Sequence, residues 1–240
     1  MATTTAKSVY FQGMADGSPF ILVIIPFASL FGLLAAEAGL SVLEAFAFSV
    51  VVIAGAAQFT ALQLMVEHAP TIVVLASALA VNLRMAMYSA SLTPYIGAAP
   101  LWQRALAAYV TVDQTYVVSI AKFERAPQMT VPERMAYFFG CVTPIIPLWF
   151  GFTLLGALLG AQVPDSWALD FAIPITFLAM IAPMFRTLAH VVAALVAVVV
   201  SLMCVGVPYS LGLIIAGVAG MMAGAQVELW LARRLAEVEQ

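Results

Sequence analysis

The sequence is poor in charge and in the residues that build catalytic or metal sites. Asp, Glu, Lys and Arg make up 9% of its 240 residues, and it has two cysteines and two histidines. Cys141 and Cys204 lie in apolar segments, which indicates packing rather than a disulfide framework. His68 and His190 are isolated, and no nucleophile–base motif or phosphate-binding loop is recognisable. We therefore expect no enzyme activity, no metal and no cofactor, and the net charge of −3 gives no reason to expect nucleic acid.

Apolar residues are abundant instead. They make up 64% of the chain, and the mean hydropathy is +1.07. This composition is typical of an all-α polytopic protein in a lipid bilayer, where each spanning helix needs about 20 mostly apolar residues. Eight windows qualify: 18–38, 43–66, 70–95, 100–122, 134–161, 166–185, 188–207 and 210–232.

The boundary between the sixth and seventh windows is the weakest, so seven helices is the alternative. We expect one transmembrane transporter domain over residues 1–240, with 1–17 as an N-terminal cytoplasmic segment and 233–240 as a cytoplasmic tail.

The basic residues predict the orientation of the chain. With the N-terminus inside, the opposite side receives only Arg104, and Arg84 lies within the membrane. Such an asymmetry is what the positive-inside rule requires, and it favours two cytoplasmic termini and an even number of spans. The basic residues expected on the cytoplasmic side are Lys7, Lys122, Arg125, Arg134, Arg186, Arg233 and Arg234.

An internal echo links the first and fifth windows. Ile25-Pro26 recurs as Ile146-Pro147, and Gly39 recurs as Gly160 at the same offset. If this echo is a repeat, the two helices share one orientation, as in transporters built from parallel repeats. Gly156-x-x-x-Gly160 and Gly220-x-x-x-Gly224 predict close helix packing or a subunit interface.

Arg84 and Asp113 are opposite charges deep inside apolar windows. A lone charge at the bilayer centre costs about 2.5–3.5 kcal/mol, so such residues face a partner or a watery cavity. If the third and fourth spans form an antiparallel pair, the two residues lie at similar depth and can contact each other. One reading is an ion pair that locks two helices. The other is a central site where Arg84 holds a carboxylate and Asp113 an ammonium group or a proton.

The second window is interrupted by small residues and an amide, in the sequence AGAAQF at residues 54–59. Gly55 can allow a membrane helix to open and offer backbone groups to a ligand. The alternative is a tight helix–helix contact in which Gln58 is hydrogen-bonded, and the spacing alone favours it. Asn82, Tyr88 and Gln114 complete the set of candidate transport residues, with Gly55, Gln58, Arg84 and Asp113.

These motifs, in this order, resemble the AzlC-type (LIV-E) family of bacterial branched-chain amino acid exporters, the large-subunit family. The resemblance covers roughly residues 11–228. It implies secondary, non-ATP-driven export of Leu, Ile, Val or similar amino acids across the bacterial inner membrane, and a small membrane partner subunit of the AzlD type. The residues that carry it are Gly13, Gly17, Pro19, Ile25-Pro26-Phe27, Phe31-Gly32, residues 54–59, Asn82-Leu83-Arg84, residues 88–92 and Asp113.

Two positions depart from the family pattern. Met85 stands where the family usually has a His, and Gln114 where it usually has a Glu. The loss of two titratable groups bears on proton coupling and on the substrate. The resemblance nonetheless predicts an ion- or proton-coupled exporter of branched-chain or similar small amino acids. The alternatives are an exporter of another small organic acid or amine, and a membrane scaffold that transports nothing.

Overall fold

The computed structural model describes residues 6–160, 185, 187–207 and 211–238, which form helices and no strand. The expected sixth span, 166–185, lies outside these residues except for its last position. The chain separates into two compact units, residues 1–62 with 78–167 and residues 63–77 with 168–240. Each unit is described by itself. The all-α membrane architecture is as expected from the composition, and four helical segments are long and apolar enough to cross a bilayer.

Two long segments form the framework of the first unit. The first comprises α1 (Ala6–Gly17), a 3-10 turn (Ser18–Phe20) and α2 (Ile21–Glu37). The second comprises α8 (Val131–Val142) and α9 (Ile146–Gly160).

The first segment starts earlier than its predicted window. Most of the segment 1–17, expected as a cytoplasmic extension, is the helix α1, which packs on α8. The hydroxyl of Tyr10 on α1 shares a hydrogen bond of 2.6 Å with that of Thr143, the residue that follows α8. This terminal stretch is therefore part of the packed framework.

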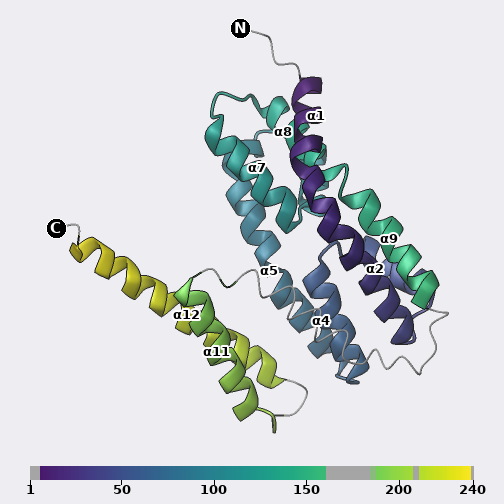
Figure 1. Ribbon diagram of the computed structural model, residues 1–240, viewed down its shortest axis with the longest axis vertical. Helices are drawn as coiled ribbons and strands as arrows, with labels where there is room; N and C mark the ends of the chain where they lie inside the picture. The colour runs from purple at the N-terminus through teal and green to yellow at the C-terminus, as the bar shows by residue number, and fades with distance from the viewer. Residues whose placement is uncertain (1–5, 161–184, 186, 208–210, 239–240) are drawn as a thin grey trace. The chain divides into compact units, whose positions relative to one another are not determined.

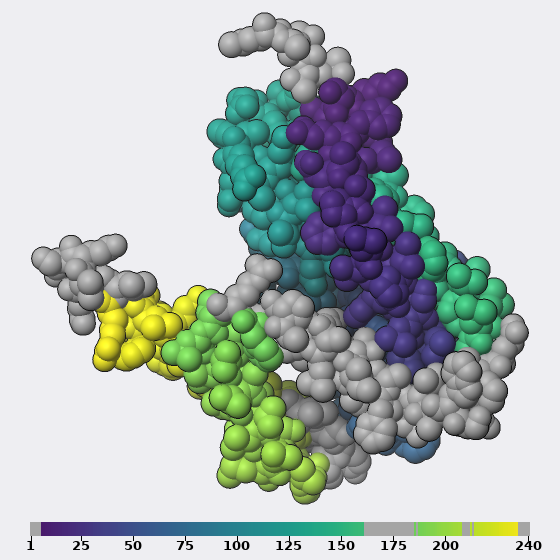
Figure 2. Space-filling view, in the orientation of Figure 1, coloured from purple at the N-terminus to yellow at the C-terminus, as the bar shows by residue number. Residues whose placement is uncertain are grey.

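The two long segments lie side by side (Figures 1 and 2), and glycines form their closest contacts. Three glycines of the first segment contact the backbone of the second at successive positions. Gly13 contacts Tyr137, Gly17 contacts Cys141 and Gly32 contacts Thr153. Gly156 and Gly160 in turn lie against Ser29 and Leu33. Because the partner numbers rise together, the segments run parallel, which is the shared orientation that the sequence echo predicts for the first and fifth windows. The close packing expected of Gly156-x-x-x-Gly160 is confirmed.

The expected second span, 43–66, is not one helix. It is divided into α3 (Val42–Val51) and α4 (Gly55–Val66), separated by three non-helical residues, 52–54. α3 follows α2 after a tight turn at 38–41, so it returns along α2. α4 then reverses again, because the chain changes direction at the break.

Ring contacts give the direction of α4. Phe48 near the end of α3 packs on Phe31 at 5.6 Å between ring centroids. At the start of α4, Gly55 faces the ring of Phe27, and one turn later Phe59 packs against both Phe27 and Phe31. α4 therefore runs in the direction of α2, and α3–α4 is a helical hairpin that enters and leaves at the same end of the unit.

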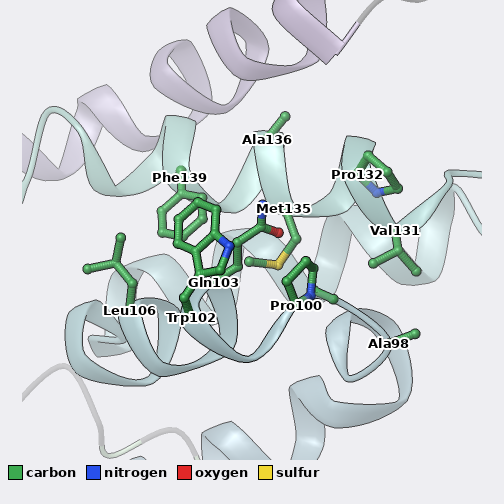
Figure 3. Close-up of a pocket in the computed structure, with 11 residues that line it drawn as sticks. Ala98, Pro100, Trp102, Gln103, Leu106, Val131, Pro132, Met135, Ala136 and Phe139 are labelled. Carbon is green, nitrogen blue, oxygen red and sulfur yellow. The ribbon is translucent and has the colours of Figure 1, made fainter.

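The expected fourth span, 100–122, is divided in the same way. It consists of α6 (Leu101–Val110) and α7 (Asp113–Arg125), separated by Thr111 and Val112. α6 follows α5 (Thr71–Ile96) after the turn at 97–100 and runs back along α8. Figure 3 shows the groove between α6 and α8. Pro100, before α6, lies near Pro132 at the start of α8, and Leu106 lies near Phe139 further along, so α6 and α8 run in the same direction.

α7 then returns to the end at which α6 began. Asp113 contacts Arg84, and Phe123 packs on Tyr95 at 5.6 Å, so α7 runs parallel to the second half of α5. The contact between the two charges is present as anticipated, but α7 reaches it parallel to α5 and not as part of one antiparallel span. The second hairpin, α6–α7, enters from the end opposite to the first.

The tips of the two hairpins meet in the middle of the unit. α3 and α6 have ten residues each, and at ~1.5 Å per residue each extends ~15 Å, half of a ~30 Å hydrocarbon core. The Tyr109 hydroxyl at the end of α6 donates a 2.5 Å hydrogen bond to the Val50 carbonyl at the end of α3. Irregular backbone at this depth is tolerated only where protein buries it or where it lines a polar cavity.

Because of the hairpins, the basic residues are distributed between the two ends of the unit differently from what the predicted spans imply. The end at which α1, α6 and α8 begin and α7 ends, at the top of Figure 1, includes Arg104. That residue, expected on the opposite side, therefore lies with the other basic residues of the unit. The opposite end includes Glu37 and Glu44 and, among the described residues of the unit, no basic residue. The basic residues at the first end are Lys7, Arg104, Lys122, Arg125 and Arg134.

The second unit contains α11 (Leu188–Met203) and α12 (Leu211–Val238), packed as an antiparallel pair. Gly220 and Gly224 both lie against Ala193, and Gly212 lies against Cys204. A Cβ at Gly220 would approach the Ala193 carbonyl to 2.7 Å. The close packing predicted from Gly220-x-x-x-Gly224 is therefore confirmed within this pair.

The hairpin topology predicts the sidedness of single cysteines. In a chain with Cys141→Ala and Cys204→Ala, we expect Ala98→Cys and Gln128→Cys to react with an impermeant maleimide from the same face of the membrane. Leu43→Cys at the start of α3 should react from the other face. A single crossing by 100–122 would place positions 98 and 128 on opposite faces, and that labelling pattern would refute the hairpin.

Candidate functional site

The ion pair lies where the tip of the second hairpin meets α5. Arg84 Nη1 is 3.0 Å from Asp113 Oδ2. Arg84 lies in the middle of α5, twelve residues before its end, and Asp113 is the first residue of α7. The positive end of the α7 dipole stabilises a carboxylate at this position. The helix break therefore places a carboxylate and a helix N-terminus beside the guanidinium group.

Two threonines stabilise the non-helical backbone between α6 and α7. Thr111 Oγ1 donates to the Ala107 carbonyl at 2.6 Å, at the end of α6. Thr115 Oγ1 accepts from the Val112 backbone N–H at 3.0 Å and donates to the Val112 carbonyl at 2.9 Å. These hydroxyls bind backbone groups that a continuous helix would pair by itself. Both threonines are buried, so their bonds are sheltered from water.

The ion pair is neither sealed nor fully paired. The side chains of Arg84 and Asp113 are 26% and 38% exposed. Arg84 Nε, Asp113 Oδ1 and Asn82 Oδ1 are buried and have no hydrogen-bond partner within the part of the chain that the structure describes. Buried polar atoms normally find a partner, so each of these three is available to a bound polar molecule or to water. The site thus offers one donor and two acceptors beyond the pair itself.

An aromatic pair lies beside the charges. Tyr88, one turn after Arg84, stacks on Tyr116 with the ring centroids 4.2 Å apart. The Tyr116 hydroxyl shares a 3.0 Å hydrogen bond with Ser91. Sequence reasoning selected Tyr88 and missed Tyr116 and Ser91. Helical spacing could have found them, because Tyr116 lies three residues after Asp113 and Ser91 seven after Arg84.

The other predicted residues are distributed between the two hairpins. Gln114 lies in the first turn of α7, next to Asp113. Gly55 begins α4, where a Cβ would clash with the rings of Phe27 and Trp149. The bend after α3 thus depends on a residue without a side chain. Gln58 lies one turn further along α4, is fully buried, and bonds to Ser49.

Each hairpin tip presents backbone polar groups at mid-depth. The last carbonyls of α3 and α6 and the first N–H groups of α4 and α7 lie at helix ends, where no intrahelical partner exists. Tips of this kind coordinate anionic groups through N–H groups and cationic groups through carbonyls. Together with the ion pair, they suit a small molecule that carries both charges.

A comparison with protein families matches residues 19–163 to the AzlC protein family, a stretch that includes both hairpins and the ion pair. The chain belongs to the AzlC family. It is 25% identical over 231 residues to the inner membrane protein YgaZ of Escherichia coli, covering 93% of this chain and 91% of YgaZ. It is 28% identical over 198 residues to an uncharacterised membrane protein of Archaeoglobus fulgidus, covering 81% and 84% of the two chains. No solved structure matches the chain.

Membership of the AzlC family, the two membrane-protein relatives and the apolar helices together support a membrane protein of the transporter type. In this AzlC protein Met85 and Gln114, the two positions at which the resemblance implies a departure from the family pattern, both adjoin the ion pair. Met85 follows Arg84 on α5, and Gln114 follows Asp113 on α7. The residue that follows each member of the pair in the chain is therefore not ionisable.

Proposed function

We propose that this AzlC protein is a secondary transporter that exports branched-chain or similar small amino acids across the bacterial inner membrane. One observation carries the proposal: two half-membrane hairpins meet from opposite ends beside a partly open Arg84–Asp113 pair. Transporters place their substrate sites near the bilayer midplane, at discontinuous helices. A scaffold that only locks helices together would have no use for an ion pair with unpaired buried atoms.

The substrate chemistry follows from the two charges. Arg84 binds the carboxylate of the amino acid, and its planar guanidinium suits a two-oxygen partner. Asp113 binds the ammonium group, with Oδ1 as the free acceptor. Asn82 and the Tyr88 ring border the same stretch of α5. An entering zwitterion would therefore exchange one protein–protein ion pair for two protein–ligand pairs, at little cost in charge burial.

The basic end of the first unit faces the cytoplasm in this proposal. Basic residues gather on the cytoplasmic side of membrane proteins, and the acidic end at Glu37 and Glu44 then faces outward. The N-terminus is cytoplasmic in this orientation, and so is the C-terminus if the number of full crossings is even. The proposal further includes coupling to an ion or a proton, and a small AzlD-type membrane subunit that binds the exposed apolar helices. It includes no catalytic step and no cofactor.

Counterflow in proteoliposomes tests the substrate class. Vesicles loaded with leucine are expected to accumulate labelled leucine, with valine and isoleucine competing. Isovalerate lacks the amine and isopentylamine lacks the carboxylate, so each is expected to compete at least ~10-fold less well, since it loses one charge-assisted contact. Thermal unfolding of the purified chain with the same compounds gives the matching binding series.

A single-charge cargo is the second candidate, and Met85 and Gln114 favour it because they leave fewer ionisable groups around the pair. If isovalerate or isopentylamine exchanges as fast as leucine, the zwitterion assignment is wrong and this second candidate replaces it. If none of these compounds exchanges or shifts the unfolding temperature, export of amino acids is refuted.

A further inference from the structure

A second polar cluster lies at the tip of the first hairpin, apart from the ion pair. It consists of Ser49 in the last turn of α3, Gln58 in the first turn of α4 and Thr153 on α9. Each of the three residues has an exposed fraction of 0%. Gln58 Nε2 donates to Ser49 Oγ at 2.9 Å, and Ser49 Oγ donates to Thr153 Oγ1 at 3.2 Å. Three neutral polar side chains are thus enclosed at mid-membrane depth.

One atom of this cluster lacks a partner. Gln58 Oε1 is buried and accepts no hydrogen bond from the residues that the structure describes. The amide nitrogen of Gln58 donates to Ser49, and the side-chain carbonyl oxygen of Gln58 is therefore left without a donor. A buried acceptor without a partner costs free energy, and such an atom points to a bound species that supplies positive charge or a proton donor.

The backbone at the same place also offers oxygen atoms. The last carbonyls of α3 carry the negative end of the helix dipole, and among them the Phe48 carbonyl accepts from the Val52 backbone N–H at 2.9 Å. The Val50 carbonyl accepts from Tyr109, so the carbonyls of Ser49 and Val51 are the ones in this turn that remain for a ligand. The local field and the oxygen-rich cluster both favour a cation over an anion.

The donor set indicates which cation. Divalent Ca²⁺ and Mg²⁺ prefer carboxylate ligands, and Ser49, Gln58 and Thr153 contain none. Hydroxyls, an amide oxygen and carbonyls of an interrupted helix are the ligands that sodium-coupled transporters use. We propose that Ser49, Gln58 and Thr153, with the carbonyl end of α3, form a sodium site at the tip of the α3–α4 hairpin.

A sodium ion in this site would have ligands both on the tip of the first hairpin and on α9, and would therefore hold the two together. The same tip contacts the second hairpin through Val50 and Tyr109, close in the chain to Asp113. Sodium occupancy thereby favours one arrangement of the two tips, and the ion is the coupling ion of the transporter. This coupling role rests on the proposed function, whereas the binding of sodium does not.

Thermal unfolding of the purified full chain tests the site. At constant ionic strength, replacing choline chloride with sodium chloride is expected to raise the unfolding temperature by several degrees, because a ligand that binds only the folded state stabilises it. Potassium chloride is expected to give a much smaller rise. Equal unfolding temperatures in sodium and choline would overturn the site, and an equal rise with potassium would overturn the assignment to sodium.

Variants locate the effect. Thr153→Val keeps the shape and removes the oxygen, so it is expected to abolish most of the sodium response. Thr153→Ser, which keeps the hydroxyl, should retain it. Thr60→Val on α4 removes a hydroxyl that donates to the Ala56 carbonyl of its own helix, and it should respond to sodium like the wild type. A full sodium response in Thr153→Val would refute the assignment.

The amino acid series separates this inference from the proposed function. A sodium response in a chain that responds to no amino acid supports the ion site and contradicts amino acid export. Leucine binding without any sodium response contradicts the ion site alone.

Discussion

Asp113→Asn is expected to reduce leucine counterflow at least ~100-fold, which corresponds to about 2.7 kcal/mol of lost binding to the transported state. The amide keeps the size of the side chain and removes the charge that pairs with Arg84 and with the substrate ammonium group. Arg84 is then left with an unmatched charge inside the membrane, so some stability is lost as well. Counterflow per folded protein, with folded protein quantified by size-exclusion chromatography, measures the first effect without the second.

The charge-swapped pair separates binding from folding. Arg84→Asp combined with Asp113→Arg restores an ion pair in the reverse orientation, so the unfolding temperature should recover while counterflow stays abolished. Arg104→Gln is the matched control, because it removes an exposed charge in the first turn of α6 and should transport normally. Normal leucine exchange by Asp113→Asn would show that the pair is structural and that the site lies elsewhere.

Gly32→Leu is expected to destroy the folded state. A Cβ at Gly32 would overlap the backbone carbonyl of Thr153, an atom that no side-chain rotation can move away. The parallel segments would have to separate, and we expect a loss of more than ~3 kcal/mol, beyond ordinary overpacking, because backbone rather than a side chain is displaced. The monodisperse fraction in size-exclusion chromatography and the unfolding temperature measure the loss.

Gly151→Leu provides the control for this prediction. Gly151 also lies on α9, but a Cβ there meets nothing within 4 Å among the described residues. It adds the same side chain to the same helix on an open face, and its unfolding temperature should remain near that of the wild type. If Gly32→Leu and Gly151→Leu behave alike, the close approach of the two segments is not what holds the unit together.

Several features could be read from the sequence because each has a strong physical cause. A charge in hydrocarbon demands a partner, so Arg84 and Asp113 predicted each other across the chain. Glycines at intervals of four indicate close backbones, and Gly156 and Gly160 do meet α2. The role of the remaining candidate residues in binding stays a prediction.

The hairpins could not be read from hydropathy. A window of apolar residues has the same mean hydropathy whether it crosses the membrane once as one helix or enters and leaves it as two short helices. Two signals were present in the sequence. Gly55 marked the first break, and Arg104, the one loop basic residue on the apparent outer side, indicated that the window 100–122 does not cross. The second break depends on the bonds of Thr111 and Thr115, which only the folded backbone reveals.

The return of α7 to its starting end has a consequence for biogenesis. If the basic end of the unit faces the cytoplasm, as proposed above, Arg104 is not carried through the lipid during insertion, because α6 begins and α7 ends at that same face. Arg84 alone among the basic residues of this unit passes into the hydrocarbon, and its counter-charge, Asp113, follows only in the second hairpin. The nascent chain therefore holds an unneutralised guanidinium group until the second hairpin folds in, which makes that hairpin the step that commits the protein to its mature topology.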